Sequence, residues 1–188
     1  MKRTLLCFGF LLSVMLLEAQ EDFGTKKIII LPESDLIIVG STNVNKFDCD
    51  FKIDLISKPM IVKFTQREEH LIFNDLKLQL EITGFDCGNK RMNSDFQNLL
   101  LGEEHPEIII ELDRIESISS EYIKANITVN LAGITKAYHL PVIIKEDHFI
   151  GKFKMNIRDF GLEPPTKALG LIEVDEEIEV QFDLKVSR

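Results

Sequence analysis

The sequence predicts a single all-β domain that follows a short leader, on three observations. The chain has 188 residues, of which 45% are hydrophobic and 28% charged, so it can bury a core. Apolar and polar residues alternate over most of residues 20–188, which is the period of half-buried antiparallel strands. Only one stretch has clear helical spacing, and no repeat or linker divides these residues.

Residues 1–19 have the layout of a cleavable signal peptide. Basic residues at positions 2 and 3 precede an apolar run over residues 5–17, and the sequence turns polar at Glu18. The run is shorter than the roughly 20 residues that span a bilayer, so a stable membrane anchor is the less favoured alternative. We therefore predict a periplasmic or secreted protein with residues 20–188 as its mature domain.

Ten segments predict strands, five of them by clear alternation. The clear segments are residues 76–82, 108–112, 123–131, 149–157 and 178–186, and the shorter ones are residues 27–31, 35–40, 44–51, 61–65 and 138–145. Turn residues at Pro32, Gly84 and Gly133 separate several of them. The total is roughly eight to ten strands.

Residues 93–101 are the segment with helical spacing. Asn93 or Ser94 can cap its start and Gly102 can end it. A single helical turn is also predicted near residues 166–169.

The composition excludes some classes of binding partner. Thirteen Phe stand against two Tyr and no Trp, and Phe has no polar group, so the domain encloses an apolar interior. The net charge of −9 argues against binding to nucleic acid and against docking to an anionic membrane surface.

Two cysteines remain once the leader is removed. Cys7 leaves with it, and Cys49 and Cys87 form an even pair in a compartment where disulfides persist, so we predict a disulfide between them. The alternative is two buried thiols that pack as small hydrophobes. The pair lacks the C-x-x-C spacing of a zinc site.

Patterns typical of catalysis or of a metal site are missing from the sequence. No serine lies in a G-x-S-x-G elbow. Asp48 and Asp50 flank Cys49 on the polar side of a strand and should face water. We predict that the protein is not an enzyme and has no metal or cofactor. The histidines, which lack the i, i+4 spacing of a helical metal site, are His70, His105, His139 and His148.

Strands that are apolar on one face can pack as a sandwich of two sheets or close into a barrel. The periodicity does not choose between the two. At about eight strands, a barrel is filled by its own side chains or holds one slender ligand.

Several blocks, in order along residues 35–186, resemble the YceI-like family of exported proteins. They are G-S-T-N-V at residues 40–44 with Phe47 and Cys49, H-P-E-I at 105–108 after Met92, Phe96 and Leu99, G-I-T-K at 133–136 with L-P-V at 140–142, R-D-F-G at 158–161, and P-P-T at 164–166. The resemblance implies a lipocalin-like antiparallel barrel of about eight strands, with one short helix near its mouth. It also implies an elongated apolar cavity that holds a polyisoprenoid chain.

The sequence departs from that family at Asn130, at Ala137 and in a charged stretch at residues 67–70. A shortened wall at this stretch would reduce the cavity. Arg158 can pair with Asp159 or with a ligand head group, and a structural salt bridge is the favoured interpretation.

If the apolar strand faces line such a cavity, ten residues are candidates for a ligand-binding wall. The alternative for each is ordinary core packing. The candidates are Phe47, Leu78, Leu80, Ile108, Ile110, Ile127, Val129, Phe153, Met155 and Phe182.

Two hypotheses of different class follow. The first is a periplasmic binding or carrier protein that sequesters an isoprenoid or other long-chain apolar lipid, because each methylene moved from water into a dry cavity contributes about 0.8 kcal/mol. The second is a ligand-free, stress-related or interaction module whose barrel is filled by side chains. Both hypotheses are compatible with a homodimer.

Overall fold

The computed structural model describes residues 22–167 and 171–187. The predicted signal peptide at residues 1–19 lies outside the described residues. Among the residues described, no helix has the length and apolar character needed to cross a membrane.

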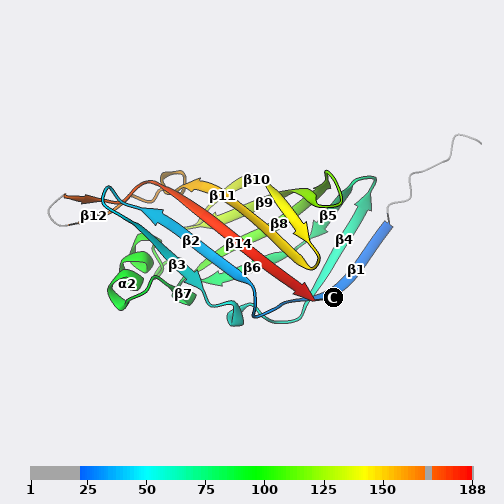
Figure 1. Cartoon of the computed structure of the whole chain (residues 1–188), viewed down its shortest axis with the longest axis horizontal. Coiled ribbons are helices and arrows are strands. Elements are labelled where there is room, and N and C mark those ends of the chain that lie inside the picture. The colour runs from blue at the N-terminus through cyan, green and yellow to red at the C-terminus, as the bar shows by residue number, and fades with distance from the viewer. Residues whose placement is uncertain (1–21, 168–170, 188) are drawn as a thin grey trace, which may run out of the picture.

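Antiparallel strands form most of the molecule (Figure 1). Twelve of the described strands belong to one sheet: β1 (Asp22–Ile30), β2 (Asp35–Ser41), β3 (Lys46–Phe51), β4 (Met60–Arg67), β5 (His70–Asn74), β6 (Lys77–Glu81), β7 (Phe85–Asp86), β8 (Glu107–Ser117), β9 (Tyr122–Leu131), β10 (Ile134–Lys145), β11 (His148–Asn156) and β14 (Glu177–Ser187). A separate hairpin consists of β12 (Thr166–Lys167) and β13 (Ile172–Glu173). The helix is α2 (Lys90–Leu99), and short 3-10 turns are η1 (Ile53–Leu55), η2 (Ile82–Gly84) and η3 (Ile157–Phe160).

Eight of these strands close into a ring. They pair in the order β1, β4, β5, β8, β9, β10, β11 and β14, and β14 returns to β1, where Ile29 pairs with Ser187 and Ile30 with Val186. Figure 1 shows the end of β14 beside β1. The predicted all-β fold, with about eight antiparallel strands closed on themselves and one short helix, is confirmed.

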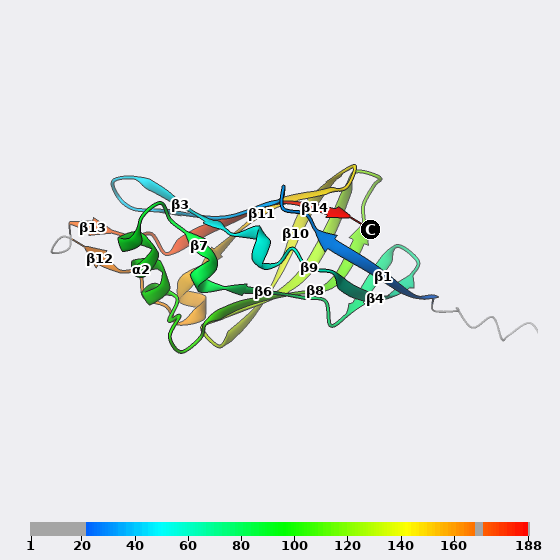
Figure 2. The ribbon, with the colours of Figure 1, turned by 90° about the horizontal axis from the view of Figure 1, so that it is seen from below.

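The ring has two different ends, because β8 and β14 change partner along their length. β8 pairs with β6 through residues 107–111 and with β5 through residues 114–116. β14 pairs with β2 through residues 179–183 and with β1 through residues 186–187. One end is therefore bounded by β1, β4 and β5. The other is bounded by β2, β3, β6 and β7, with α2 beside them (Figure 2).

The end beside α2 holds the dry core. Phe51, Phe85 and Phe96 are buried and lie in a row, with ring centroids 5.0 and 5.3 Å apart. Cys49 and Cys87 form the predicted disulfide, which joins β3 to the segment before α2. Packing and a covalent link together hold the helix side of the molecule.

The helix begins earlier than the sequence predicts. Asn89, rather than Asn93 or Ser94, is the N-cap, and its side chain accepts a hydrogen bond from the backbone N–H of Met92 at 3.0 Å. Asn93 lies inside the helix and accepts a hydrogen bond from the backbone N–H of Cys87 at 2.7 Å. Both asparagine side chains accept a hydrogen bond from a backbone N–H, so the residue type alone does not show which of them caps the helix.

The end of the helix also differs from the prediction. The helix stops at Leu99, and Leu101 has a φ of 54°, a left-handed conformation that breaks the helix before Gly102. The predicted helical turn at residues 166–169 is wrong in its first half, since residues 166 and 167 form strand β12. Its second half lies outside the described residues.

Each of the ten predicted segments overlaps a strand, while β5, β7, β12 and β13 were not predicted. β7 has only two residues, too few for a period to show. The charged stretch at residues 67–70 does not shorten the wall, because Glu68 and Glu69 form the turn between β4 and β5 and Arg67 pairs with His70 across it.

Candidate functional site: an apolar cavity

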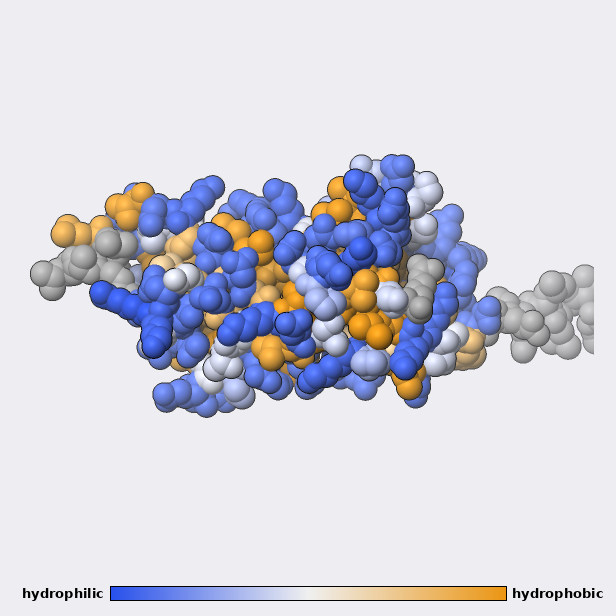
Figure 3. Space-filling model, turned by 60° about the horizontal axis from the view of Figure 1, so that its bottom comes forward, coloured by the Kyte–Doolittle hydropathy of each residue, from blue (hydrophilic) through white to orange (hydrophobic). Residues whose placement is uncertain are grey.

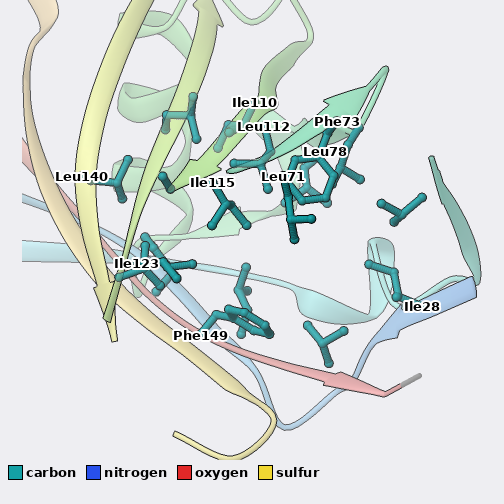
Figure 4. A pocket seen from close by; sticks show the side chains of 18 of the residues that line it. Ile28, Leu71, Phe73, Leu78, Ile110, Leu112, Ile115, Ile123, Leu140 and Phe149 are labelled. Atoms are coloured by element: carbon teal, nitrogen blue, oxygen red, sulfur yellow. The ribbon is translucent and has the colours of Figure 1, made fainter. Parts of the chain in front are cut away.

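The end of the ring bounded by β1, β4 and β5 encloses a cavity of about 500 Å³. Alternate side chains of each strand point inward and build its wall. Figure 4 shows side chains from many strands directed into one common space. Those labelled there are Ile28, Leu71, Phe73, Leu78, Ile110, Leu112, Ile115, Ile123, Leu140 and Phe149.

The cavity divides the predicted wall residues into two groups. Five of the ten line it, namely Leu78, Ile110, Ile127, Phe153 and Phe182. They come from β6, β8, β9, β11 and β14, which the fold brings around one space. Contact between these side chains and a ligand stays a prediction.

Four of the other five form a layer that we call the cavity floor. Each is buried and lies two positions from a lining residue on the same face of the same strand; they are Leu80, Ile108, Val129 and Met155. The fifth, Phe47, lies on β3 with its ring over Gly40 and packs against the core. None of these five lines the cavity. Strand periodicity identifies an apolar face but not the depth at which a cavity ends.

β1, β4 and β5 supply part of the cavity wall, but none of the ten predicted wall residues lies on these strands. Phe64 on β4 and Phe73 on β5 both line the cavity, with ring centroids 6.4 Å apart. The alternation of Val62 and Phe64 was an available signal for β4. Nothing comparable marks β5, where three apolar residues stand in a row.

The exposed residues of the lining are also its polar ones, and we call them the cavity rim. They are Lys26, Glu69 and Ser117, whereas the other described lining residues are apolar and buried or half-buried. The backbone N–H of Ser117 donates to the carbonyl of Glu69 at 3.0 Å, so these two are adjacent. Lys26 projects from β1 in alternation with Ile28. The rim marks where the cavity meets solvent.

Charged pairs lie on the outer face of the same strands. Glu116 on β8 contacts Arg114 at 2.8 Å and Lys124 at 3.5 Å. A hydrogen bond from the side chain of Asn126 holds the pKa of Glu116 below its ordinary value. Figure 3 shows apolar side chains visible between polar ones on one face of the molecule. Charge is therefore placed outside the wall, and the interior is apolar.

The described residues hold no group of three His, Cys, Asp or Glu side chains placed to bind a metal ion. Asp48 and Asp50 are exposed on β3. His148 Nδ1 lies 2.6 Å from a carboxylate oxygen of Asp183 on the outer face. Neither feature lies in the cavity lining.

Arg158 forms structural ion pairs, although not with the predicted partner. Its side chain pairs with Glu176 at 2.7 Å and with Glu163, instead of with Asp159. Both partners lie downstream of η3, so the pairs tie the segment after β11 to the approach to β14. Arg158 is not part of the cavity lining.

Solved structures share this fold. The structure is similar to BcnA of Burkholderia cenocepacia, with a TM-score of 0.63 and 15% identity over 85% of this chain and 99% of that one. It is similar to a polyisoprenoid binding domain of Saccharophagus degradans, with a TM-score of 0.55 and 11% identity over 86% and 97% of the two chains. A Campylobacter jejuni YCEI protein gives a TM-score of 0.51 and 19% identity over 62% of this chain and 74% of that one.

The sequence itself gives the family. Comparison with curated proteins yields no significant match. A family model described as the YceI-like domain matches residues 37–186, which is most of the chain. The matched span runs from β2 to β14 and so includes the floor and most of the cavity wall. The chain belongs to the YceI-like domain family.

Proposed function

We propose that the protein is an exported binding or carrier protein that holds an isoprenoid-like lipid in the cavity. The observation that carries the proposal is a cavity of about 500 Å³ whose lining is apolar except at the rim. Cavities of this size suit small ligands. Because each methylene moved out of water contributes about 0.8 kcal/mol, a long apolar chain binds without any charged group.

One structural relative supports the ligand class. The Saccharophagus degradans protein is described as a polyisoprenoid binding domain. The contacts that we propose to such a chain include the five predicted wall residues on the lining, Leu78, Ile110, Ile127, Phe153 and Phe182.

The alternative, a ligand-free interaction module, fits the cavity less well. A barrel filled by its own side chains would be packed at the density of a protein interior and would leave no space of this size. Catalysis also lacks support, because Lys26 and Glu69 are the titratable groups among the described lining residues and both are exposed.

Export is part of the proposal. The signal-peptide layout of residues 1–19 and the Cys49–Cys87 disulfide both suit an oxidising compartment outside the cytoplasm. Cell fractionation followed by N-terminal sequencing is expected to find a mature chain that begins at residue 20 in the periplasm or medium. A cytoplasmic chain that retains its leader would contradict export.

The test of lipid binding uses two neighbouring residues on β6. Leu78 lines the cavity, whereas Gln79 is exposed on the outer face. Leu78→Glu places a carboxylate in the apolar wall and is expected to lower the lipid recovered by organic extraction at least about tenfold, as measured by mass spectrometry. Gln79→Glu adds the same charge outside and should leave the lipid content unchanged.

The unaltered protein, purified from its native compartment, is expected to carry isoprenoid in a ratio close to one per chain. If it carries none and also fails to bind an apolar fluorescent dye, the proposal is wrong. Melting curves of both variants identify loss of lipid that is caused by unfolding.

A further inference from the structure

We infer that the ligand is a single-chain lipid of about twenty carbons whose uncharged, hydrogen-bonding head group stays at the rim. The inference rests on the proposed function and deepens it, because it specifies the length and the head group of the lipid. The cavity volume, the floor and the rim each carry one part of it.

The volume sets the length of the chain. An apolar protein cavity of about 150 Å³ holds one benzene molecule, which has six carbons. On that scale, a cavity of about 500 Å³ holds about twenty carbons, the content of four isoprene units. A chain twice as long would leave half of its carbons outside this space.

The floor prevents a longer chain from reaching deeper. Val129 is 1% exposed and Leu80 is 2% exposed, so the layer is closely packed. Beyond it, the interior is filled by the row of phenylalanine rings and is held by the disulfide. A chain that passed the floor would have to displace closely packed side chains, which destabilises the folded protein.

The rim determines the head group. It offers an ammonium group on Lys26, a carboxylate on Glu69 and a hydroxyl on Ser117, and within the described part of the chain none of these side chains has a hydrogen-bond or ion-pair partner. An anionic head would be attracted by Lys26 but repelled by Glu69, and a cationic head the reverse, so neither charge gains a net attraction at the rim. An alcohol both donates and accepts hydrogen bonds, so it is compatible with all three groups.

The length is tested with a series of prenyl alcohols of two, three, four, five, six and eight isoprene units. Each is supplied from cyclodextrin and competes with an apolar fluorescent dye on the full mature chain. Affinity is expected to rise by about tenfold for each unit up to four, and by less than about threefold in total beyond four.

The outcomes of the series separate the two proposals. An affinity that keeps rising to eight units would overturn the length inference and leave lipid binding intact. If no alcohol of the series displaces the dye, lipid binding and the inference both fail.

A matched pair of variants tests whether the cavity sets the limit. Phe153 lines the cavity beside the floor residue Met155, whereas Phe47 does not line it. Phe153→Ala is expected to move the length at which affinity levels off from four units to five, and Phe47→Ala to leave it at four. An unchanged limit in Phe153→Ala would contradict the inference. Phe153→Leu is a milder substitution, with a smaller shift in the same direction, should the alanine variant fold poorly.

The head group is tested at constant chain length. The four-unit alcohol is expected to bind at least about tenfold more tightly than the corresponding phosphate or primary amine, since a charged head loses hydration beside one like and one opposite charge and gains no net attraction to offset that loss. Glu69→Gln should specifically improve binding of the phosphate, and Lys26→Met binding of the amine. A phosphate that binds the unaltered protein more tightly than the alcohol would overturn this part of the inference.

Discussion

Three glycines allow phenylalanine rings to lie flat along the sheet. Each glycine pairs directly with the phenylalanine of a neighbouring strand, and the pairs are Gly24 with Phe64, Gly40 with Phe47, and Gly151 with Phe182. A methyl group on any of these glycines would lie 2.1 to 2.4 Å from the ring. Two of the three rings line the cavity, so the missing side chains on Gly24 and Gly151 keep those rings against the wall.

Gly151→Ala is therefore expected to reduce the cavity. The new methyl group overlaps the ring of Phe182 and pushes it toward the space that the ligand would occupy. We expect a loss of about 1–3 kcal/mol in the free energy of unfolding, as is usual for overpacking, and weaker dye binding by the folded protein. Urea denaturation and dye titration measure the two effects.

Gly40→Ala is the control for this substitution. Its methyl group meets the ring of Phe47 at the same distance of 2.4 Å, but Phe47 lies outside the cavity lining. It should lower stability by a similar amount and leave dye affinity unchanged. Equal loss of affinity in both variants would show that the ring of Phe182 does not set the size of the cavity.

At the scale of single residues, the sequence could predict which way a side chain points but not what it meets. Leu78 and Leu80 occupy equivalent positions in the alternation of one strand, yet Leu78 lines the cavity and Leu80 lies in the floor. The difference arises because β8 changes its partner from β6 to β5 beyond this point. That pairing joins segments far apart in the chain and leaves no local pattern.

At the scale of elements, α2 shows how capping fixes a boundary. The side chain of Asn89 accepts a hydrogen bond from Met92, and removing such a cap costs about 1 kcal/mol. We expect Asn89→Ala to lower the free energy of unfolding by this amount, while Ser94→Ala, at the site that the sequence favoured, changes it little. Equal effects of the two substitutions in urea denaturation would contradict the observed cap.

The disulfide connects two elements that the sheet joins only weakly. β7 has two residues and pairs with β3, and the disulfide lies just beyond that pairing. Replacing both Cys49 and Cys87 with serine is expected to lower the free energy of unfolding by about 4 kcal/mol on the chain-entropy account. Dye binding should persist below the melting temperature, because the cavity lies at the other end of the ring. Loss of binding in protein that is still folded would contradict this separation.

Most elements could be predicted because their alternation is long. β9 and β14 have ten and eleven residues, which is enough for a period of two to be clear. β5 has five residues with three apolar ones in succession, and its preceding charges resemble a loop. Its place in the wall is imposed by pairing with β4 and β8, which only the folded chain shows.

At the scale of the whole molecule, the two ends of the ring differ in how firmly they are held. The core end has buried aromatic rings and a disulfide, while β1 joins β14 through Ile29 and Ile30 only, within the described residues. We expect faster amide hydrogen exchange in β1 and β4 than in the buried part of β9 without ligand. Adding the four-unit prenyl alcohol should slow exchange in β1, β4 and β5. Slowing confined to α2 and β7 would place the ligand elsewhere.

β1 lies before residue 37, where the match to the family model begins. A chain that started at residue 37 would keep α2, the disulfide and the floor, but β4 and β14 would both lose the strand that joins them. Its cavity would be open to water along the gap between β4 and β14. The nine residues from Asp22 to Ile30 thus decide whether this protein has a chamber that is walled all the way round below its rim, and they lie outside the span by which its family is recognised.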